Sequence, residues 1–419
     1  MDSRHPRSSR LRASVRGWLA TIRAQPILSP TTLFEQSVER LGGHPADTSH
    51  EPHLVAAIDW LVRAHDATAD DGISRGFSLV WNRYFAGRGW QPSYPETTGY
   101  IIPTLLGAAC RLDETDLRDR ALRAARWEIE VQLPSGAVRG GVIGEPASPA
   151  VFNTGQVVLG WLAAFEETGQ GVFADAALRA GRYLVALLES DGHWRRGNSH
   201  FARGDATLYN TRTAWALAEA GARLQETAFT DAAARTLRAA VLMQAANGWL
   251  PSCCLSDPAR PLLHTLAYAI RGLLEGGRVL SDTGLVRSAE RAAAPLAMAV
   301  RRDGWMSGRF RADWSPAVEW ACLTGEAQMA NNWMRLAEIT GDGKWLEPVP
   351  AVLAFLKRSQ NRTSRDSGLR GGIKGAWPLG GGYGAYEVLS WATKFFADAL
   401  MRHEAIQLPA RPLLVSVLA

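Results

Sequence analysis

Apolar residues along the chain fall into two kinds of helical stretch, which alternate from residue 52 to residue 402. The first kind is amphipathic: Leu54, Ile58, Leu61 and Val62, for example, repeat at helical spacing. The second kind is apolar on almost every side, and such a helix has to be buried. We predict amphipathic helices at 52–67, 115–132, 172–189, 228–246, 282–299 and 344–359, and buried helices at 97–111, 153–167, 209–224, 263–275, 322–340 and 384–402.

A short polar group opens each buried stretch. Asn153-Thr154-Gly155-Gln156 is the clearest example, and equivalent groups are centred on Thr98, Thr211, Thr265, Thr324 and Ala385. Steps of roughly 55 to 60 residues separate these centres, a spacing that indicates a repeat architecture. The Thr residues are expected to cap the helices that follow them.

The links between the helices also alternate. Links that follow a buried helix are short, whereas links that precede one are long and contain X-Gly turn signals such as Asn247-Gly248 and Asp303-Gly304. We therefore predict an all-α fold, an (α/α)6 toroid of six helical hairpins at 51–405, with small β-hairpins in the long links. Residues 1–50 would form an N-terminal arm and 406–419 a C-terminal tail. A straight solenoid is the alternative, but helices that are apolar all round favour a closed ring. Function is expected on the side of the long links.

Composition narrows the function classes. The net charge of +5 is small for 419 residues and is spread along the chain, so nucleic acid is not an expected partner. The four Cys form no CxxC pair, which indicates a reducing compartment, no metal site and no cofactor. The 16 Trp include several in Gly-rich links, where they could stack on sugars or fill gaps between helices.

No secretory signal is recognisable at the N-terminus, and we expect a cytoplasmic protein. Leu11, Val15, Leu19 and Ile22 share one helical face among Arg residues. This pattern would allow peripheral membrane contact through the arm. A solvated or docked arm is the favoured alternative.

Three carboxylates are candidates for acid–base catalysis, because each lies beside the polar start of a buried helix: Glu96, Glu326 and Glu387. Burial beside aromatic residues would raise their pKa values, as a general acid requires. Each could instead interact with the positive end of its helix. Asp205 and Glu319 are weaker candidates in the links.

A ring of other polar and aromatic residues is expected around the same mouth. Candidate substrate-binding residues are Tyr100, Asn153, Gln156, Asn210, Arg212, His264, Tyr268, Trp249, Trp305 and Trp377. Such a set suits a polyhydroxylated or anionic sugar. His264 and Tyr268 lie one helical turn apart and indicate a second chemistry, β-elimination or C5 epimerisation of a uronate whose carboxylate Asn210 and Arg212 would neutralise.

The chain resembles the broad group of α/α-toroid proteins, which includes six-hairpin glycosidases, uronate lyases, glucuronyl C5-epimerases and terpenoid cyclases. The segments Glu96–Leu106 (ETTGYIIPTLL) and Phe152–Leu159 (FNTGQVVL) resemble uncharacterised toroid proteins encoded beside bacterial surface-polysaccharide genes. The resemblance implies a carbohydrate-related role and assigns no catalytic residue. An Asp-rich cyclase motif is missing. Trp320-Ala321-Cys322 is similar to a lanthionine cyclase zinc motif but lacks the Cys-His-Gly that would complete it.

Together these features predict a glycan-processing enzyme that acts on a bacterial oligo- or polysaccharide, with carboxylate acid–base catalysis as in glycoside hydrolases. A uronate lyase or C5-epimerase is the second hypothesis. A non-catalytic glycan-binding component of polysaccharide biosynthesis is the third.

Overall fold

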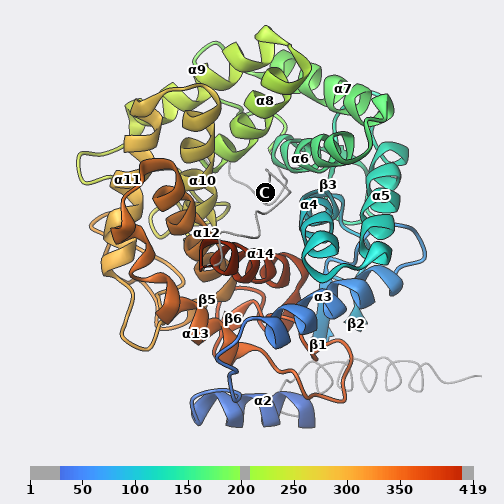
Figure 1. Cartoon of the computed structure of the whole chain (residues 1–419), viewed down its shortest axis with the longest axis vertical. Helices are drawn as coiled ribbons and strands as arrows, with labels where there is room; N and C mark the ends of the chain where they lie inside the picture. The colour runs from blue at the N-terminus through green and yellow to red at the C-terminus, as the bar shows by residue number, and fades with distance from the viewer. Residues whose placement is uncertain (1–28, 199–207, 408–419) are drawn as a thin grey trace, which may run out of the picture.

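Six helices form a closed inner ring in the computed structural model, which describes residues 29–198 and 208–407 (Figure 1). Each inner helix packs against the next one, and the last packs against the first. The inner helices are α4 (Pro95–Leu112), α6 (Val151–Thr168), α8 (Thr211–Leu224), α10 (Leu263–Val279), α12 (Leu323–Thr340) and α14 (Ser390–Gln407). The chain is thus an (α/α)6 toroid, as the periodicity predicts.

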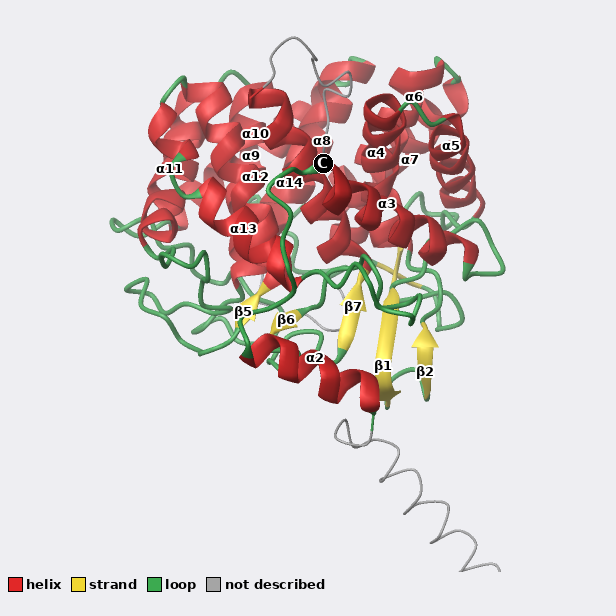
Figure 2. Ribbon diagram, turned by 60° about the horizontal axis from the view of Figure 1, so that its bottom comes forward, coloured by secondary structure: helices red, strands yellow, loops and turns green. Residues whose placement is uncertain are grey.

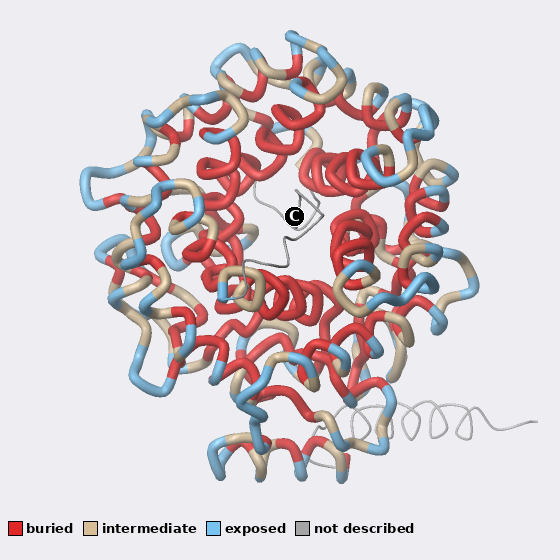
Figure 3. Tube along the Cα trace, in the orientation of Figure 1, coloured by how far each residue is buried: buried red, intermediate tan, exposed pale blue. Residues whose placement is uncertain are grey.

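Six amphipathic helices surround this ring. They are α3 (Glu51–Asp66), α5 (Thr115–Glu130), α7 (Gly171–Leu187), α9 (Thr227–Met243), α11 (Thr283–Met298) and α13 (Val349–Ser359), the last preceded by the 3-10 turn η3 (Gly343–Leu346). In α9, for example, Phe229, Ala233, Leu237 and Ala240 are buried against the ring. Figure 3 shows the pattern: the inner helices are buried, and the outer helices expose one side. Most predicted boundaries lie within a few residues of the observed ones.

Glycines allow the inner helices to approach closely. A Cβ atom on Gly160 of α6 would lie 2.2 Å from the carbonyl oxygen of Gly99 on α4, and one on Gly155 would lie 2.8 Å from the backbone of Thr213 on α8. Gly169, at the end of α6, has a φ of +67°. A left-handed glycine at this position ends the helix, as the short links predict.

The repeated threonines do not cap their own helices. In four of the six inner helices the side chain of the fourth helical residue instead accepts a hydrogen bond from a backbone N–H of the preceding link, and thereby ties that link to the ring. Such bonds join Ile73 to Thr98, Val138 to Thr154 and Ile373 to Thr393, each at 2.9 Å. In the sixth repeat the anchor is therefore Thr393 rather than Ala385, and α14 begins at Ser390, six residues later than predicted.

Short strands lie at the end of the toroid where the inner helices begin (Figure 2). A three-stranded antiparallel sheet has the order β2-β1-β7 and contains β1 (Gly76–Asn82), β2 (Gly87–Trp90) and β7 (Glu387–Leu389). Two-residue pairs join β3 (Arg139–Gly140) to β4 (Ser148–Pro149) and β5 (Ala321–Cys322) to β6 (Ala376–Trp377). Because β7 pairs with β1, the sheet connects the last hairpin of the ring to the first.

The predicted arm, residues 1–50, contains the helix α2 (Pro30–Arg40), which lies across the strand-bearing end (Figure 2). Lys374, in the link before α14, is fully buried and pairs with Glu35 and Glu39 of α2 at 3.1 and 2.9 Å. Part of the predicted arm is therefore built into the body. The membrane-contact prediction concerns residues 11–22, which lie outside the described part. Among the described helices, none has the length and apolar character needed to cross a membrane.

Candidate active site

A cavity of about 320 Å³ lies at the strand-bearing end of the toroid, on the side of the long links. The starts of α4, α10 and α14 contribute residues to it, together with β1, β7 and their flanking loops. Its lining contains Arg75, Asn82, Tyr84, Phe85, Tyr94, Glu96, Gly141, Val142, Leu255, His264, Tyr383, Glu387 and Trp391. Two of the three predicted acid–base carboxylates and the predicted histidine thus share one cavity.

Glu96 is held at the beginning of α4, where Pro95 occupies the first helical position. The hydroxyl of Tyr94 donates a hydrogen bond to its Oε2. Burial raises the pKa of Glu96 to about 7, although the Tyr94 hydrogen bond and the positive charges of Arg75 and Arg212 act in the opposite direction. Near neutral pH a large fraction of Glu96 therefore carries a proton that it can donate.

Glu387 has the opposite surroundings. It is the first residue of β7, and antiparallel pairing places it opposite Ser78 on β1. Its Oε1 accepts hydrogen bonds from the side-chain amides of Asn82 and Gln91, both at 2.7 Å, and the guanidinium of Arg75 lies 3.3 Å from both carboxylate oxygens. Each of these partners is a donor, which is the environment that suits a carboxylate acting as an acceptor or base.

Aromatic rings form one wall of the cavity. The guanidinium of Arg75 lies over Phe85 and Trp391, 5.4 and 4.9 Å from the ring centroids. Trp391 in turn donates its indole N–H to the hydroxyl of Tyr383 at 2.9 Å. Rings fixed in this way offer an apolar face on which a sugar can stack, beside a cation and two carboxylates.

His264 lies at the start of α10, with its ring between those of Tyr268 and Tyr383 at centroid distances of 4.5 and 5.3 Å. Its Nδ1 is 2.8 Å from Oε1 of Gln328. Burial lowers the pKa of His264 to about 4, so the ring is neutral at pH 7. Since the Gln328 carbonyl accepts the Nδ1 proton, Nε2 keeps its lone pair and can act as a base.

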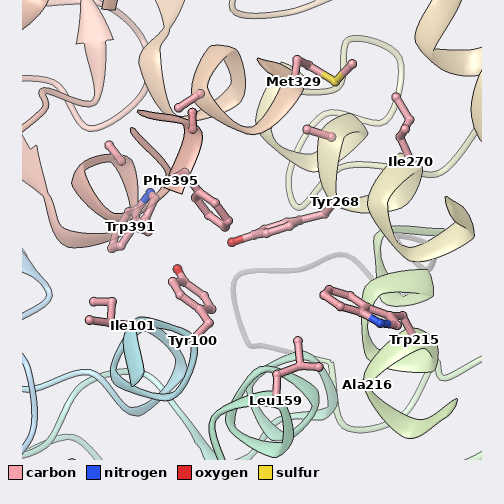
Figure 4. Packing of buried hydrophobic residues seen from close by; sticks show 14 of the residues in the cluster. Tyr100, Ile101, Leu159, Trp215, Ala216, Tyr268, Ile270, Met329, Trp391 and Phe395 are labelled. Carbon is pink, nitrogen blue, oxygen red and sulfur yellow. The ribbon is translucent and has the colours of Figure 1, made fainter. Parts of the chain in front are cut away.

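Four of the predicted substrate-binding residues lie beneath the cavity rather than in its lining: Tyr100, Gln156, Arg212 and Tyr268. Figure 4 shows the hydroxyl ends of Tyr100 and Tyr268 directed toward one another in the interior of the ring. Arg212 donates from Nε to Oε1 of Gln156 at 2.7 Å. These residues can influence the cavity only through the residues that line it.

The two predicted asparagines are buried and also lie outside the lining. Asn153 donates to the carbonyl oxygen of Arg139 at 3.0 Å, and Asn210 donates to Asn198 at 3.1 Å. Each amide fastens a link to the start of an inner helix.

The predicted tryptophans lie between helices and links, not in the cavity. Trp249 is buried edge-to-face against Trp314, with centroids 5.1 Å apart. Trp305 lies beneath the guanidinium of Arg301, and Trp377 lies beneath the ammonium of Lys374. The tryptophan that lines the cavity is instead Trp391.

Glu326 is fully buried and lies outside the cavity lining. It is the fourth residue of α12, and its Oε1 accepts the backbone N–H of Met306 at 2.8 Å. This is the bond that Thr98 and Thr154 make in their repeats, so Glu326 takes the place of an anchoring threonine. Glu319 is exposed, and Asp205 lies outside the described residues.

The residues that sequence reasoning missed come mainly from the first and last links: Arg75, Asn82, Tyr94, Tyr383 and Trp391. The pairing of β1 with β7 brings these links together. Trp391 carried a usable signal, because it follows Glu387 by four residues at the beginning of a buried helix. Arg75 carried none, since a single Arg in a Gly-rich link has no distinguishing pattern.

The chain matches no family model and no curated protein. Solved structures with the same fold are nevertheless found. An unsaturated glucuronyl hydrolase specific for heparin aligns with a TM-score of 0.67 at 15% identity, covering 85% of this chain and 97% of that one. The unsaturated glucuronyl hydrolase of Bacillus sp. GL1 gives 0.65 at 13% identity, with coverage of 85% and 97%. A D-mannose isomerase gives 0.63 at 10% identity, with coverage of 87% and 99%.

These neighbours are α/α toroids that act on carbohydrates. At such low identity they establish the toroid fold of this chain and leave its chemistry to be argued from its own residues.

Proposed function

We propose that the protein is a glycan-processing enzyme, a glycoside hydrolase in which Glu96 is the general acid and Glu387 the general base. The observation that carries this proposal is one cavity with two carboxylates in opposite surroundings. Glu96 is half-buried beside Tyr94 and has a raised pKa, whereas Glu387 is surrounded by hydrogen-bond donors. Pairs of acidic groups whose environments differ in this way perform acid and base roles in glycoside hydrolysis.

In the proposed reaction, Glu96 gives its proton to the glycosidic oxygen as the bond from that oxygen to the sugar carbon breaks. Glu387 accepts a proton from the water that attacks the same carbon. The products are two free sugars, and solvent returns both carboxyl groups to their starting states. Trp391 and Phe85 would hold the sugar ring, and Arg75 would hold Glu387 in place.

The substrate class is an oligosaccharide with a sugar end that fits a cavity of about 320 Å³. The cation Arg75 favours an anionic sugar. The names of the neighbouring hydrolases refer to unsaturated glucuronyl groups and heparin, and they also support an anionic sugar as substrate. The sequence resemblance at 96–106 and 152–159 adds bacterial surface polysaccharides as candidate sources.

The test is turnover of an oligosaccharide panel, with and without an unsaturated glucuronyl end, measured as release of reducing sugar. Glu96→Gln and Glu387→Gln should each lower kcat at least 100-fold while the proteins stay folded. Glu130→Gln, which changes an exposed carboxylate on α5, is the matched control and should keep full activity. If both cavity variants retain wild-type turnover, the acid–base assignment is wrong.

A second candidate is proton abstraction from a sugar carbon, as in an isomerase, epimerase or lyase. The observation that favours it is the neutral ring of His264 in the same cavity. His264 Nε2 would be the base. Tyr268 is less suited to that role, because burial raises its pKa and it lies beneath the cavity. Loss of a deuterium label from the sugar carbon, abolished by His264→Asn and retained in Glu387→Gln, would favour this chemistry over hydrolysis.

A further inference from the structure

Helix α2 is attached to the toroid by its polar side, the reverse of the usual arrangement of a surface helix. Its buried residues are Thr32, Glu35 and Glu39. Glu35 and Glu39 pair with the fully buried Lys374. Oε2 of Glu39 also accepts the backbone N–H of Leu379 at 2.8 Å. Ion pairs and hydrogen bonds therefore hold α2 to the body, and its apolar residues are left for the opposite face.

That opposite face is apolar and open to solvent. Leu33 and Phe34 are 45% and 61% exposed, and Leu41, which follows the last turn, is 87% exposed. Pro30 and Ser37 complete the same side of the helix, and both are exposed and uncharged. We refer to these five residues as the outer face of α2. Large apolar side chains gathered in this way on the surface of a soluble protein mark a site of interaction.

An exposed tryptophan lies at the same end of the toroid. Trp81, near the end of β1, is 36% exposed, and Arg83 in the turn that follows is also exposed. Residues of β1 contact residues of α2, and Figure 2 shows both elements at the strand-bearing end. Tryptophan is enriched at membrane–water interfaces, and arginine binds phosphate groups. The neighbourhood of α2 therefore has the side chains that suit a lipid surface.

The sequence before α2 carries a concentrated positive charge. Of the 46 basic and 41 acidic residues of the chain, residues 1–28 contain six Arg and one Asp. The whole net charge of +5 therefore belongs to this segment, because the 40 basic and 40 acidic residues from 29 to 419 balance. The segment also contains the four apolar residues at helical spacing within 11–22. It leads directly into Ser29, which caps α2.

We propose that the strand-bearing end of the toroid docks on an anionic lipid bilayer, with the outer face of α2 at the boundary of the acyl chains and residues 1–28 on the headgroups. A second copy of the chain would cover the outer face but would bring two strongly basic segments together. Residues 1–28 folded back on α2 would cover it as well. Either occupant accounts for the apolar face alone, whereas an anionic bilayer complements both the apolar face and the adjoining positive charge.

Lipid binding goes beyond the proposed function and does not depend on it. It nevertheless bears on the substrate, because the candidate active site lies at the same end of the toroid as α2. Docking would bring that cavity to the membrane surface, where glycans attached to lipid would be within its reach. This consequence rests on the proposed function, whereas lipid binding itself requires no activity.

Flotation of the full chain with lipid vesicles tests the proposal. The chain should bind vesicles of phosphatidylcholine that contain about 30% phosphatidylglycerol, and should bind vesicles of phosphatidylcholine alone at least about 10-fold more weakly. Because salt screens contacts with the headgroups, binding should weaken at about 0.5 M sodium chloride. Absence of binding to the anionic vesicles at low salt, or equal binding to both kinds of vesicle, would overturn the proposal.

A double change on the outer face, Leu33→Ser with Phe34→Ser, tests the role of α2. It should lower the affinity for anionic vesicles about 10-fold or more, because two apolar side chains no longer enter the bilayer. Val172→Ser is the matched control. Val172 is 53% exposed at the beginning of α7, at the opposite end of the toroid, and this variant should bind as the wild type does. An unchanged affinity in the double variant would contradict the proposal.

Sedimentation velocity without lipid distinguishes a second copy of the chain from a bilayer. A wild-type dimer that Leu33→Ser with Phe34→Ser dissociates would place a second copy on the outer face and overturn the proposal. Turnover of a soluble oligosaccharide should be equal in the double variant and the wild type, because both side chains lie outside the cavity lining. Loss of lipid binding and loss of hydrolysis are therefore separate results, and either proposal can fail without the other.

Discussion

Replacing Glu96 with glutamine should change how the stability of the protein depends on pH. In the native protein the pKa of Glu96 is raised from 4.5 to about 7, mainly by burial. The unfolded chain therefore releases this proton at a lower pH than the native protein does. Between these two pKa values, rising pH favours the unfolded state, so the stability of the wild type falls through this window. Glutamine does not ionise, and the variant should lack this loss.

The magnitude follows from the same pKa values. A pKa difference of about 2.5 units corresponds to about 3.4 kcal/mol in full, of which about 2.5 kcal/mol develops between pH 5 and pH 8. Part of the Glu96 side chain faces the cavity, where water screens its charge, so about 1–2.5 kcal/mol is the expected range. Relative to the wild type, Glu96→Gln should gain this much free energy of unfolding when the pH rises from 5 to 8.

Guanidinium unfolding followed by tryptophan fluorescence measures the effect at both pH values. The free energy of unfolding of the wild type is subtracted from that of the variant at each pH, and this subtraction removes the contribution of the other titrating groups. Glu130→Gln, at an exposed carboxylate on α5, should show no change in that difference. A change below about 0.5 kcal/mol for Glu96→Gln would mean that Glu96 ionises like a solvated carboxylate. The case for Glu96 as a general acid would then fail.

Three further outcomes are expected. Trp391→Ala should raise KM for the oligosaccharide about 10-fold or more with a smaller effect on stability, as measured by initial rates and thermal melting, because a stacking face is lost. Glu326→Ala should lower the free energy of unfolding, measured by denaturant titration, by about 1–3 kcal/mol, because the backbone N–H of Met306 loses its acceptor. Glu326→Gln keeps an acceptor oxygen and should lower the free energy of unfolding by less than half as much. Lys374→Met should lower the free energy of unfolding by about 3–5 kcal/mol and speed amide hydrogen exchange in α2, because the carboxylates of Glu35 and Glu39 stay buried without the lysine cation. An exchange rate in α2 equal to that of the wild type would contradict this role.

The ring was predictable because its physical cause is visible in the sequence. Helices that are buried on all sides have to alternate with helices that bury one side, and the spacing of the polar groups gives the repeat length. The shared location of Glu96, Glu387 and His264 was predictable for the same reason, since each lies near the start of an inner helix and those starts meet at one mouth. Their hydrogen-bond partners could not be predicted, because strand pairing between the first and last links brings those partners together.

The differences from expectation at Glu326 and Ala385 concern position and have one origin, the register of the repeat. The bond-forming position is the fourth helical residue, occupied by Thr98, Thr154, Glu326 and Thr393. In the predicted register the fifth repeat is centred on Thr324, and Glu326 is therefore interpreted as an extra residue of the repeat. Glu326 in fact occupies the position of the anchoring threonine. Trp249, Trp305 and Trp377 follow the gap-filling alternative in their packing, because a Gly-Trp turn indicates an ordered link but does not show which way the ring points.

The central claim is that Glu96 and Glu387 act on one glycan in the cavity between them. It is tested most directly by a crystal structure of Glu96→Gln soaked with an oligosaccharide that the wild type cleaves. The account predicts a sugar ring stacked on Trp391, with the glycosidic oxygen within hydrogen-bonding distance of residue 96. A sugar bound elsewhere on the toroid, with this cavity empty, would contradict it.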